Sequence, residues 1–306
     1  MTFSAKIKEE LCKMPLKNPE SVLAECCGLI LFANPTRKDK IKIITENKDV
    51  AHRASWLLKS LFGFDFDKKI IPATSLKKFN LIIETPEKLD IIFDSFGIDS
   101  TASLSLRLNA AIVESDESRA AFCRGAFLSG GSVTDPESAY HLELATSHNT
   151  LSREVVSLLL DLDLPAKTAT RKSNYIIYFK ESGHIEEFLT RIGAPVSAIE
   201  LMQTKMLKNV RNRTNRQVNC DLANLNKAAD AAKGHLSDIN TIIDSGEFDN
   251  LPPQLQSAAN LRLAYPDATL SELVGYSNGE IGKSGLNHRF ARLHTIAEEI
   301  KSRKDS

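Results

Sequence analysis

The sequence has few cysteines, and those it has are badly spaced for a disulfide framework or a metal site. The five cysteines form no CxxC pair and no Cys/His group at zinc-ligand spacing. This pattern favours reduced thiols over disulfides or a zinc knuckle. We therefore expect all five to be buried or inert: Cys12, Cys26, Cys27, Cys123 and Cys220.

Long hydrophobic runs and an excess of charge are also lacking. The charged N-terminus contains no apolar core segment, and no later stretch approaches the length of a membrane span. We expect a cytoplasmic protein with no membrane partner. Lys plus Arg (39) balance Asp plus Glu (39), so any affinity for a polyanion must come from how the charge is distributed.

The chain nevertheless has the composition of a folded protein, with 306 residues of which 42% are hydrophobic. This length suits one large domain or two ordinary ones. Two short apolar segments with an early glycine stand out, Cys26–Asn34 and Cys123–Gly131. A single such segment could equally be an ordinary buried helix, but here the pattern occurs twice.

The same order of elements follows both segments: strand, helix, two strands and helix. After the first segment we expect these elements at Ile41–Thr45, His52–Leu61, Phe66–Ala73, Phe79–Glu84 and Pro86–Phe96. After the second we expect them at Tyr140–Ala145, Leu151–Leu162, Ala166–Thr170, Tyr175–Phe179 and Ile185–Ile192. Lys77-Lys78 and Arg171-Lys172 mark equivalent hairpins. The pattern indicates an internal duplication.

Both segments resemble the LAGLIDADG helix of homing endonucleases, in which the eighth motif position carries a metal-binding carboxylate. Those positions are Ala33 and Gly130 here, and neither residue can ligate a metal. Other carboxylates are poor substitutes: Asp135 lies beyond the end of the second helix, and Glu25 lies at the start of the first motif, about two turns from the end of that helix. We expect no nuclease activity, metal or cofactor, and we expect Gly28 and Gly125 to let the two helices pack closely across a saddle of two small antiparallel sheets.

Basic residues on the predicted sheet faces could follow DNA phosphates, but acidic residues are interspersed, and an ordinary solvated surface is the favoured interpretation. Whether the saddle contacts DNA stays open. The basic residues are Arg37, Lys38, Lys40, Lys42, Arg171 and Lys172.

The segment Gln203–Cys220 contains five basic residues, several asparagines and no acidic residue. Two interpretations are open: a helix or arm that runs along DNA, or a linker helix whose cations pair with acids of the flanking domains. The candidate DNA-binding residues of this segment are Lys208, Arg211, Arg213 and Arg216.

The C-terminal region predicts three helices. Pro252-Pro253 opens the first and Tyr265-Pro266 ends it; Thr269 to Glu272 is a capping box for the second. A turn follows, and the last helix begins at about Lys283. The layout is that of a helix-turn-helix, although an amphipathic helix docked on its own domain is the plainer alternative. The candidate DNA-binding residues of the last helix are Lys283, Ser284, Asn287, His288, Arg289 and Arg292.

The strings Asn215–Asn224 (NRQVNCDLAN) and Lys283–Arg289 (KSGLNHR), together with the paired degenerate helices, resemble the WhiA family of bacterial DNA-binding regulators. The resemblance covers essentially the whole chain. It implies a nucleoid-associated transcription regulator of sporulation or cell-division genes that binds promoters, with RNA polymerase or a second regulator as candidate partners. It also implies an inactive endonuclease-like domain and a helix-turn-helix similar to the promoter-reading domain of sigma factors.

We accordingly expect an α+β protein whose duplicated saddle is followed by an all-α domain. The expected divisions are a LAGLIDADG-like domain at 1–196 with repeats at about 17–98 and 117–193, a basic linker at 197–222, and a helix-turn-helix domain at 223–306. Two other functions compete with duplex DNA binding. A maturase-like RNA-binding scaffold is disfavoured by the 7% aromatic content, and a residual endonuclease is disfavoured by the missing carboxylates.

Overall fold

The computed structural model describes residues 1–306 except 17, 34–35, 71–77, 100–105, 278–280 and 305–306. The chain divides into two compact units, Met1–Asn209 and Val210–Ser306. This division lies inside the segment expected to be a linker. The helix α8 (Pro195–Asp244) begins in the first unit and ends in the second, so the basic segment is helical.

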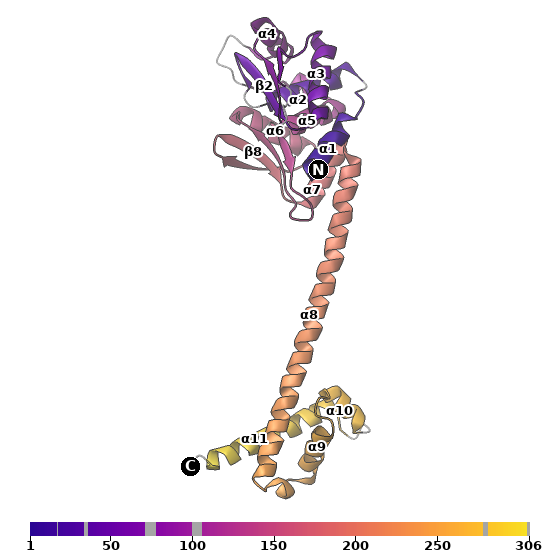
Figure 1. The fold of residues 1–306 in the computed structure, drawn as a ribbon, viewed down its shortest axis with the longest axis vertical. Helices are drawn as coiled ribbons and strands as arrows, with labels where there is room; N and C mark the ends of the chain where they lie inside the picture. Colours follow the sequence, from indigo (N-terminus) through magenta and orange to yellow (C-terminus); the bar gives the residue numbers. More distant parts are fainter. Residues whose placement is uncertain (17, 34–35, 71–77, 100–105, 278–280, 305–306) are drawn as a thin grey trace. The chain divides into compact units, whose positions relative to one another are not determined.

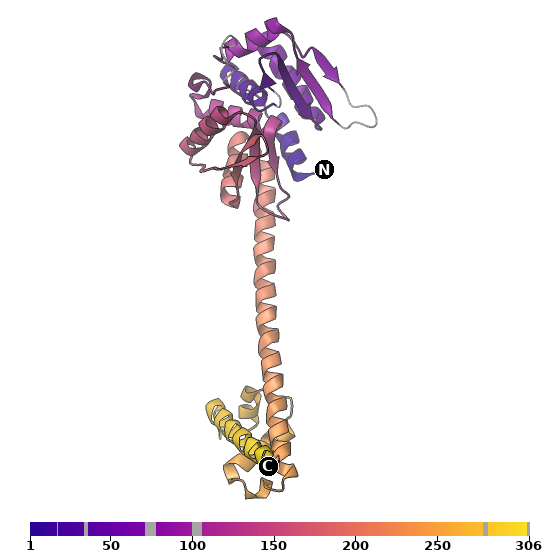
Figure 2. The ribbon, with the colours of Figure 1, turned by 90° about the vertical axis from the view of Figure 1, so that its left-hand side faces the viewer.

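The first unit contains two four-stranded antiparallel sheets of the same topology, β1-β2-β4-β3 and β5-β6-β8-β7 (Figure 1, Figure 2). The predicted duplication of sheets with helices is therefore confirmed. The elements of the first repeat are α2 (Pro19–Leu31), β1 (Thr36–Arg37), β2 (Lys40–Thr45), α3 (Lys48–Phe62), β3 (Lys68–Ile70), β4 (Phe79–Ile83) and α4 (Pro86–Ser95). Those of the second are the 3-10 helix η1 (Ala110–Val113), α5 (Asp116–Gly130), β5 (Gly131–Val133), β6 (Leu142–Thr146), α6 (Asn149–Asp161), β7 (Lys167–Arg171), β8 (Asn174–Phe179) and α7 (Ser182–Ile192).

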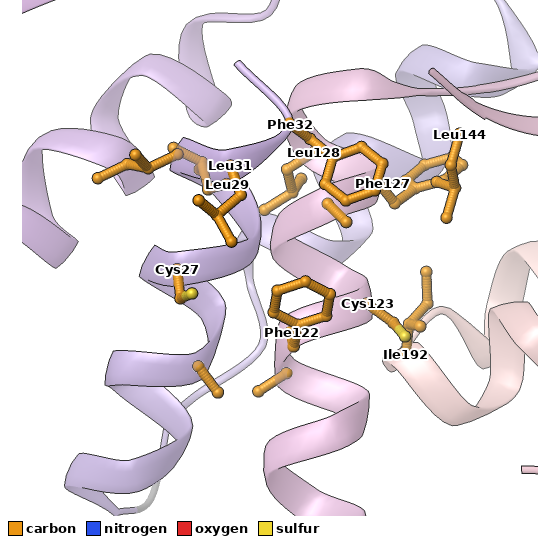
Figure 3. Packing of buried hydrophobic residues seen from close by; sticks show 14 of the residues in the cluster. Cys27, Leu29, Leu31, Phe32, Phe122, Cys123, Phe127, Leu128, Leu144 and Ile192 are labelled. Carbon is orange, nitrogen blue, oxygen red and sulfur yellow. The ribbon is translucent and has the colours of Figure 1, made fainter. Parts of the chain in front are cut away.

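The helices α2 and α5 lie side by side at the centre of this unit (Figure 3). Their facing side chains, among them Phe122 and Cys27, belong to one core that is shared by both repeats. Figure 3 also shows Phe127 of α5 beside Leu144 of β6. Because this core includes residues of both sheets, neither repeat is built to stand alone.

Several predicted boundaries shift for local reasons. The helix α3 begins before His52 because the Asn47 side chain accepts hydrogen bonds from the amides of Asp49 and Val50. The helix α5 ends at Gly130 as expected, but Gly131 is extended and begins β5 directly. In the expected hairpins, Lys172 has a left-handed φ of 55°, whereas Lys77 and the end of the strand predicted to reach Ala73 lie outside the described residues.

The helix α1 (Phe3–Cys12) is an element that the sequence analysis did not predict. Its buried residues Phe3, Ile7 and Leu11 recur every fourth position, which is a helical spacing. Ser4 exchanges hydrogen bonds with the backbone of Val133. Near the other end of α1, Glu10 accepts hydrogen bonds from the backbone amides of Val196 and Ser197 at the start of α8. The helix α1 therefore fastens the second sheet to the start of α8.

The second unit is all-α and has its own core. The end of α8 is followed by the 3-10 helix η2 (Phe248–Asn250) and by α9 (Pro253–Ala264), α10 (Leu270–Tyr276) and α11 (Lys283–Lys304). The core includes Ile239 of α8, Leu273 of α10 and Phe290 of α11. The predicted capping box is present, since Thr269 and Glu272 exchange hydrogen bonds between side chain and backbone.

The five cysteines differ in burial. Cys26, Cys27 and Cys123 are buried, and burial raises the pKa of each thiol, that of Cys123 to about 12. Cys12 is half-buried, with its pKa raised to about 12 for the same reason. Cys220 is exposed on α8, so of the expected alternatives, buried or inert, burial does not apply to it, and its inertness stays a prediction. In the part of the chain that the structure describes, no helix could cross a membrane.

Candidate nucleic-acid interface

The corner where homing endonucleases hold metal is closed by packing. Ala33 is buried, and its carbonyl accepts a hydrogen bond of 3.0 Å from the Thr36 hydroxyl. A Cβ atom at Gly130 would lie 2.6 Å from the carbonyl oxygen of Ala145 and 3.1 Å from the Phe32 ring. A carboxylate could enter position 130 only if the backbone of β6 moved.

Glu25, a carboxylate on the first motif helix, accepts hydrogen bonds from two guanidinium groups. It lies on α2, is completely buried, and accepts hydrogen bonds from Arg53 Nε at 2.7 Å and Arg124 Nε at 2.6 Å. Arg53 Nη2 also donates to Glu25 at 3.1 Å, while the Nη1 atoms of Arg53 and Arg124 donate to the backbone carbonyls of Met14 and Ile192. The network joins the two repeats, and because two guanidinium cations already surround this buried carboxylate, a metal cation there would be repelled.

On the sheet faces, several basic residues are neutralised by acids. Lys40 alternates with buried residues of β2, so it lies on the face away from the helices, and both it and Lys68 pair with Glu84. In the second sheet, Arg171 lies 3.6 Å from Glu143, which also contacts His141 at 3.2 Å. Such pairing leaves less positive charge for phosphates and agrees with the favoured interpretation of an ordinary surface.

The helix α11 presents a polar and basic face over its first three turns. Leu286, Phe290 and Leu293 point into the core. Of the six candidate residues, Arg289 is half-buried and the other five are exposed: Lys283, Ser284, Asn287, His288 and Arg292. Between described residues, the ion pairs of α11 come from its later turns and leave its basic residues before His294 unpaired.

A buried arginine holds this helix in place. Arg262 of α9 is 1% exposed, donates to the carbonyls of Tyr265, Pro266 and Ala268, and lies over the Phe290 ring of α11. His235 of α8 stacks on the same ring at 4.1 Å between centroids. Burial and the nearby Arg262 lower the pKa of His235. The start of α11 is therefore oriented by α8 and α9 together.

One group in the described part of the chain has the composition of a metal site. The ligand atoms of Asp238, His294 and Glu298 lie within 4.8 Å of one another. However, His294 Nδ1 contacts Asp238 at 2.8 Å, and Lys301 Nζ contacts Glu298 at 2.8 Å. Because Lys301 already supplies the cation, the group is explained as an ion-pair network between α8 and α11.

The middle of α8 carries a second set of cations. Every residue from Arg211 to Lys227 is exposed. At 100° per residue, Arg213, Arg216, Cys220 and Lys227 fall on one side of the helix, which we call the basic side.

Lys208 and Lys205 have different surroundings from those cations. Lys208 donates a hydrogen bond of 2.6 Å to the Pro136 carbonyl and lies over the Tyr140 ring. Lys205 lies 3.3 Å from Glu186. Lys205 and Lys208 thus behave as expected for a linker helix whose cations contact the protein itself. Arg213 and Arg216 do not, because they have no ion pair with any described residue.

The comparisons with known proteins agree with this geometry. Residues 119–211 match the model of the WhiA LAGLIDADG-like domain, and residues 214–297 match the model of the WhiA C-terminal HTH domain. The probable cell division protein WhiA of Clostridium botulinum is 38% identical over 98% of this chain and 99% of its own length. The crystal structure of full-length WhiA from Thermatoga maritima is similar with a TM-score of 0.58 and 25% identity, covering 98% of this chain and 99% of that one.

Proposed function

Because the chain belongs to the WhiA family, we propose that it is a sequence-specific regulator that binds double-stranded DNA at the promoters of sporulation and cell-division genes. The observation that carries this proposal is the exposed face of α11, which has no acidic residue from Lys283 to His294. A recognition helix enters the major groove with its first turns, and those are the turns that carry the exposed amide and basic groups.

In this mechanism the two basic regions have different roles. Asn287 offers a donor and an acceptor on one planar group, which suits adenine, and Arg292 offers a fork of donors, which suits guanine. Arg213 and Arg216 on α8 contact phosphates and add affinity without sequence information. Lys208 is left out of this set because its ammonium group is held by Pro136 and Tyr140.

Binding of duplex DNA can be compared directly with binding of structured RNA, the main alternative. Fluorescently labelled promoter DNA, random duplex and structured RNA should be compared at one stated salt concentration, since affinities for nucleic acid depend on salt. We expect promoter DNA to bind most tightly. Tighter binding of the RNA would replace this proposal with a maturase-like RNA-binding function.

We further propose that the protein does not cleave DNA. The reasons are the methyl group of Ala33, the blocked position at Gly130 and the engagement of Glu25 by two arginines. Supercoiled plasmid incubated with purified protein and Mg²⁺ or Mn²⁺ should stay supercoiled. Nicking or linearising activity that co-purifies with the protein through successive columns would show a residual nuclease.

The remaining parts of the proposal concern cellular context. We propose that residues 1–196 serve as the scaffold and residues 223–306 as the reader, with 197–222 between them. We also place the protein in the cytoplasm on the nucleoid, with RNA polymerase or a second regulator as partner. Chromatin immunoprecipitation in the source bacterium tests the association with the nucleoid. Proteins that co-precipitate after DNase treatment test the proposed protein partners.

A further inference from the structure

The middle of α8 carries exposed amides in addition to its basic side. Four exposed asparagines contribute them: Asn212, Asn215, Asn219 and Asn226. None of these amides forms a hydrogen bond with a described residue. At about 100° per residue the four fall within an arc of about 60°, which we call the asparagine side. It adjoins the basic side, because Arg216 lies only about 40° from Asn212.

The stability of α8 does not explain these asparagines. Every residue from Arg211 to Lys227 is exposed, so packing does not select the side chains there. Asparagine is a poor helix former, because its amide competes for backbone hydrogen bonds, and alanine would stabilise an exposed helix more. Solvated helices are also stabilised by acid–base pairs three or four residues apart, but Gln203–Cys220 contains no acidic residue. The composition of the asparagine side therefore indicates contact with another molecule.

Given the proposed binding of duplex DNA, on which this inference rests, we propose that the asparagine side is a second base-reading surface. It contacts adenine-containing base pairs in the major groove and acts in addition to α11. An asparagine amide holds one donor and one acceptor in a plane, and these match N7 and N6 of adenine. A continuous exposed helix fits the major groove of DNA, as the basic regions of bZIP proteins do. The major groove of double-stranded RNA is too narrow for side chains to read.

The distribution of charge around α8 selects a polyanion as the partner of this side. Arg213 and Arg216 on the adjoining basic side have no acidic residue three or four positions away and no ion pair with a described residue. When the asparagine side faces the bases, these cations lie toward the phosphates. Asp221 lies on the opposite side of the helix, away from the bases. The asparagine side ends where Asp230 follows at the same angle, because an acid there would be repelled by phosphates.

The two base-reading surfaces are separated along the axis of α8. This helix enters the core of the second unit at Ile239, and that core also contains Phe290 of α11. At about 1.5 Å per residue, Asn226 and Asn212 precede Ile239 by about 20 Å and about 40 Å. At about 3.4 Å per base pair these lengths correspond to about 6–12 base pairs. We therefore expect the bases that α8 contacts to form a block of their own, within about twelve base pairs of the block that α11 contacts.

Selection by the full chain from a pool of random DNA duplexes, followed by sequencing, tests the second surface. The wild type should enrich two blocks of bases. The double variant Asn215→Ala/Asn219→Ala should lose about tenfold of its preference for adenine in one block, because paired base contacts are lost. Asn287→Ala should lose the other block instead. The matched control Gln217→Ala removes an amide from the opposite side of α8 and should keep both blocks.

Failure of the second surface can be distinguished from failure of the proposed function. If the double variant enriches the same sequences as the wild type, α8 reads no bases, while loss of a block in Asn287→Ala would still support reading by α11. A wild type that enriches no sequence would overturn both. Alanine is the better helix former, so loss of a block in the double variant does not come from a weakened helix, and circular dichroism checks this.

The salt dependence of binding gives a second measurement. Asparagine carries no charge, so the double variant should keep the wild-type slope of log affinity against log salt, whereas each lost phosphate contact of a cation lowers the slope by about one. A slope that falls in the double variant would mean that phosphate contacts, and not base contacts, had been lost, and would overturn the assignment.

Discussion

Gly28 and Gly125 occupy equivalent positions in the two repeats, and each lies against the backbone of the other's helix. A Cβ at Gly28 would lie 2.1 Å from the carbonyl oxygen of Phe122, and one at Gly125 would lie 2.0 Å from that of Glu25. Both contacts are shorter than any packing allows. The close contact between the two helices therefore requires a glycine in each motif, although the metal-binding carboxylates at the helix ends are missing.

Gly125→Ala should destabilise the first unit by about 3 kcal/mol or more, because the added methyl group meets a main-chain carbonyl that cannot rotate away. Trp56 is the single tryptophan and lies on α3 of this unit, so its fluorescence during urea unfolding reports the change. Gly183→Ala is the control, since a Cβ there meets nothing within 4 Å. Comparable losses from the two substitutions would contradict the packing argument.

Glu25→Gln should cost about 3–5 kcal/mol in the free energy of unfolding, because it leaves the buried guanidinium groups of Arg53 and Arg124 without their counter-charge. The control is Glu9→Gln, which removes a solvent-exposed pair with Lys13 and should leave the free energy of unfolding close to the wild-type value. If Glu25→Gln unfolds at the wild-type urea concentration, the network is not a stabilising one.

These two sites illustrate what the sequence could and could not predict. The repeat and its glycines were predictable because the same pattern occurs twice in the sequence, and the capping box at Thr269 was predictable because it depends on neighbours along the chain. The Glu25 network was not, because its arginines come from α3 and α5, far away in sequence. The α1 helix was missed although Phe3, Ile7 and Leu11 carried its signal. Its few apolar residues are separated by charged ones, so the segment resembles a charged, solvated N-terminus.

The exposed face of α11 was also predictable, but the depth of each residue on it was not. The lack of acidic residues indicated a reader helix, whereas the half-burial of Arg289 depends on how α11 packs on α8 and α9. Likewise, the string around Lys208 and Arg213 looked uniform in sequence. The structure separates a lysine held by Pro136 from arginines that point to solvent.

Asn287→Ala should reduce the preference for promoter over random DNA by about tenfold or more, because loss of a paired base contact costs about 1–3 kcal/mol of discrimination. Competition binding with both duplexes at one salt concentration measures the ratio. Arg289→Ala, at another of the candidate DNA-binding residues, should have the smaller effect on discrimination because its side chain is half-buried. The reverse order would move the reading position from Asn287 to Arg289.

Arg213→Ala should weaken binding to promoter and random DNA alike and should lower the slope of log affinity against log salt by about one, as expected for a lost phosphate contact. Lys208→Ala serves as the comparison, because its amine already bonds to Pro136; the salt slope should stay at the wild-type value. A salt slope that falls equally in both variants would return Lys208 to the DNA-contacting set.

Lys8 should make the stability of the first unit depend on alkaline pH. Its ammonium group lies 5.8 Å from the centre of the Phe127 ring, and burial lowers its pKa from 10.5 to about 8. Below pH 8 both the folded and the unfolded chain hold this proton, and the folded state bears the cost of the buried charge. Between pH 8 and pH 10.5 the folded state releases the proton first, so this group makes the free energy of unfolding rise with pH.

Lys8→Met removes that charge while it keeps the length of the side chain. The variant should therefore be more stable than the wild type at pH 7, and its advantage should shrink at pH 10, when the folded wild type has lost the same charge. Urea unfolding followed by Trp56 fluorescence at the two pH values gives the comparison, and the difference between the proteins cancels other groups that titrate in this range. An advantage of the same size at both pH values would mean that Lys8 keeps an ordinary pKa in the folded chain.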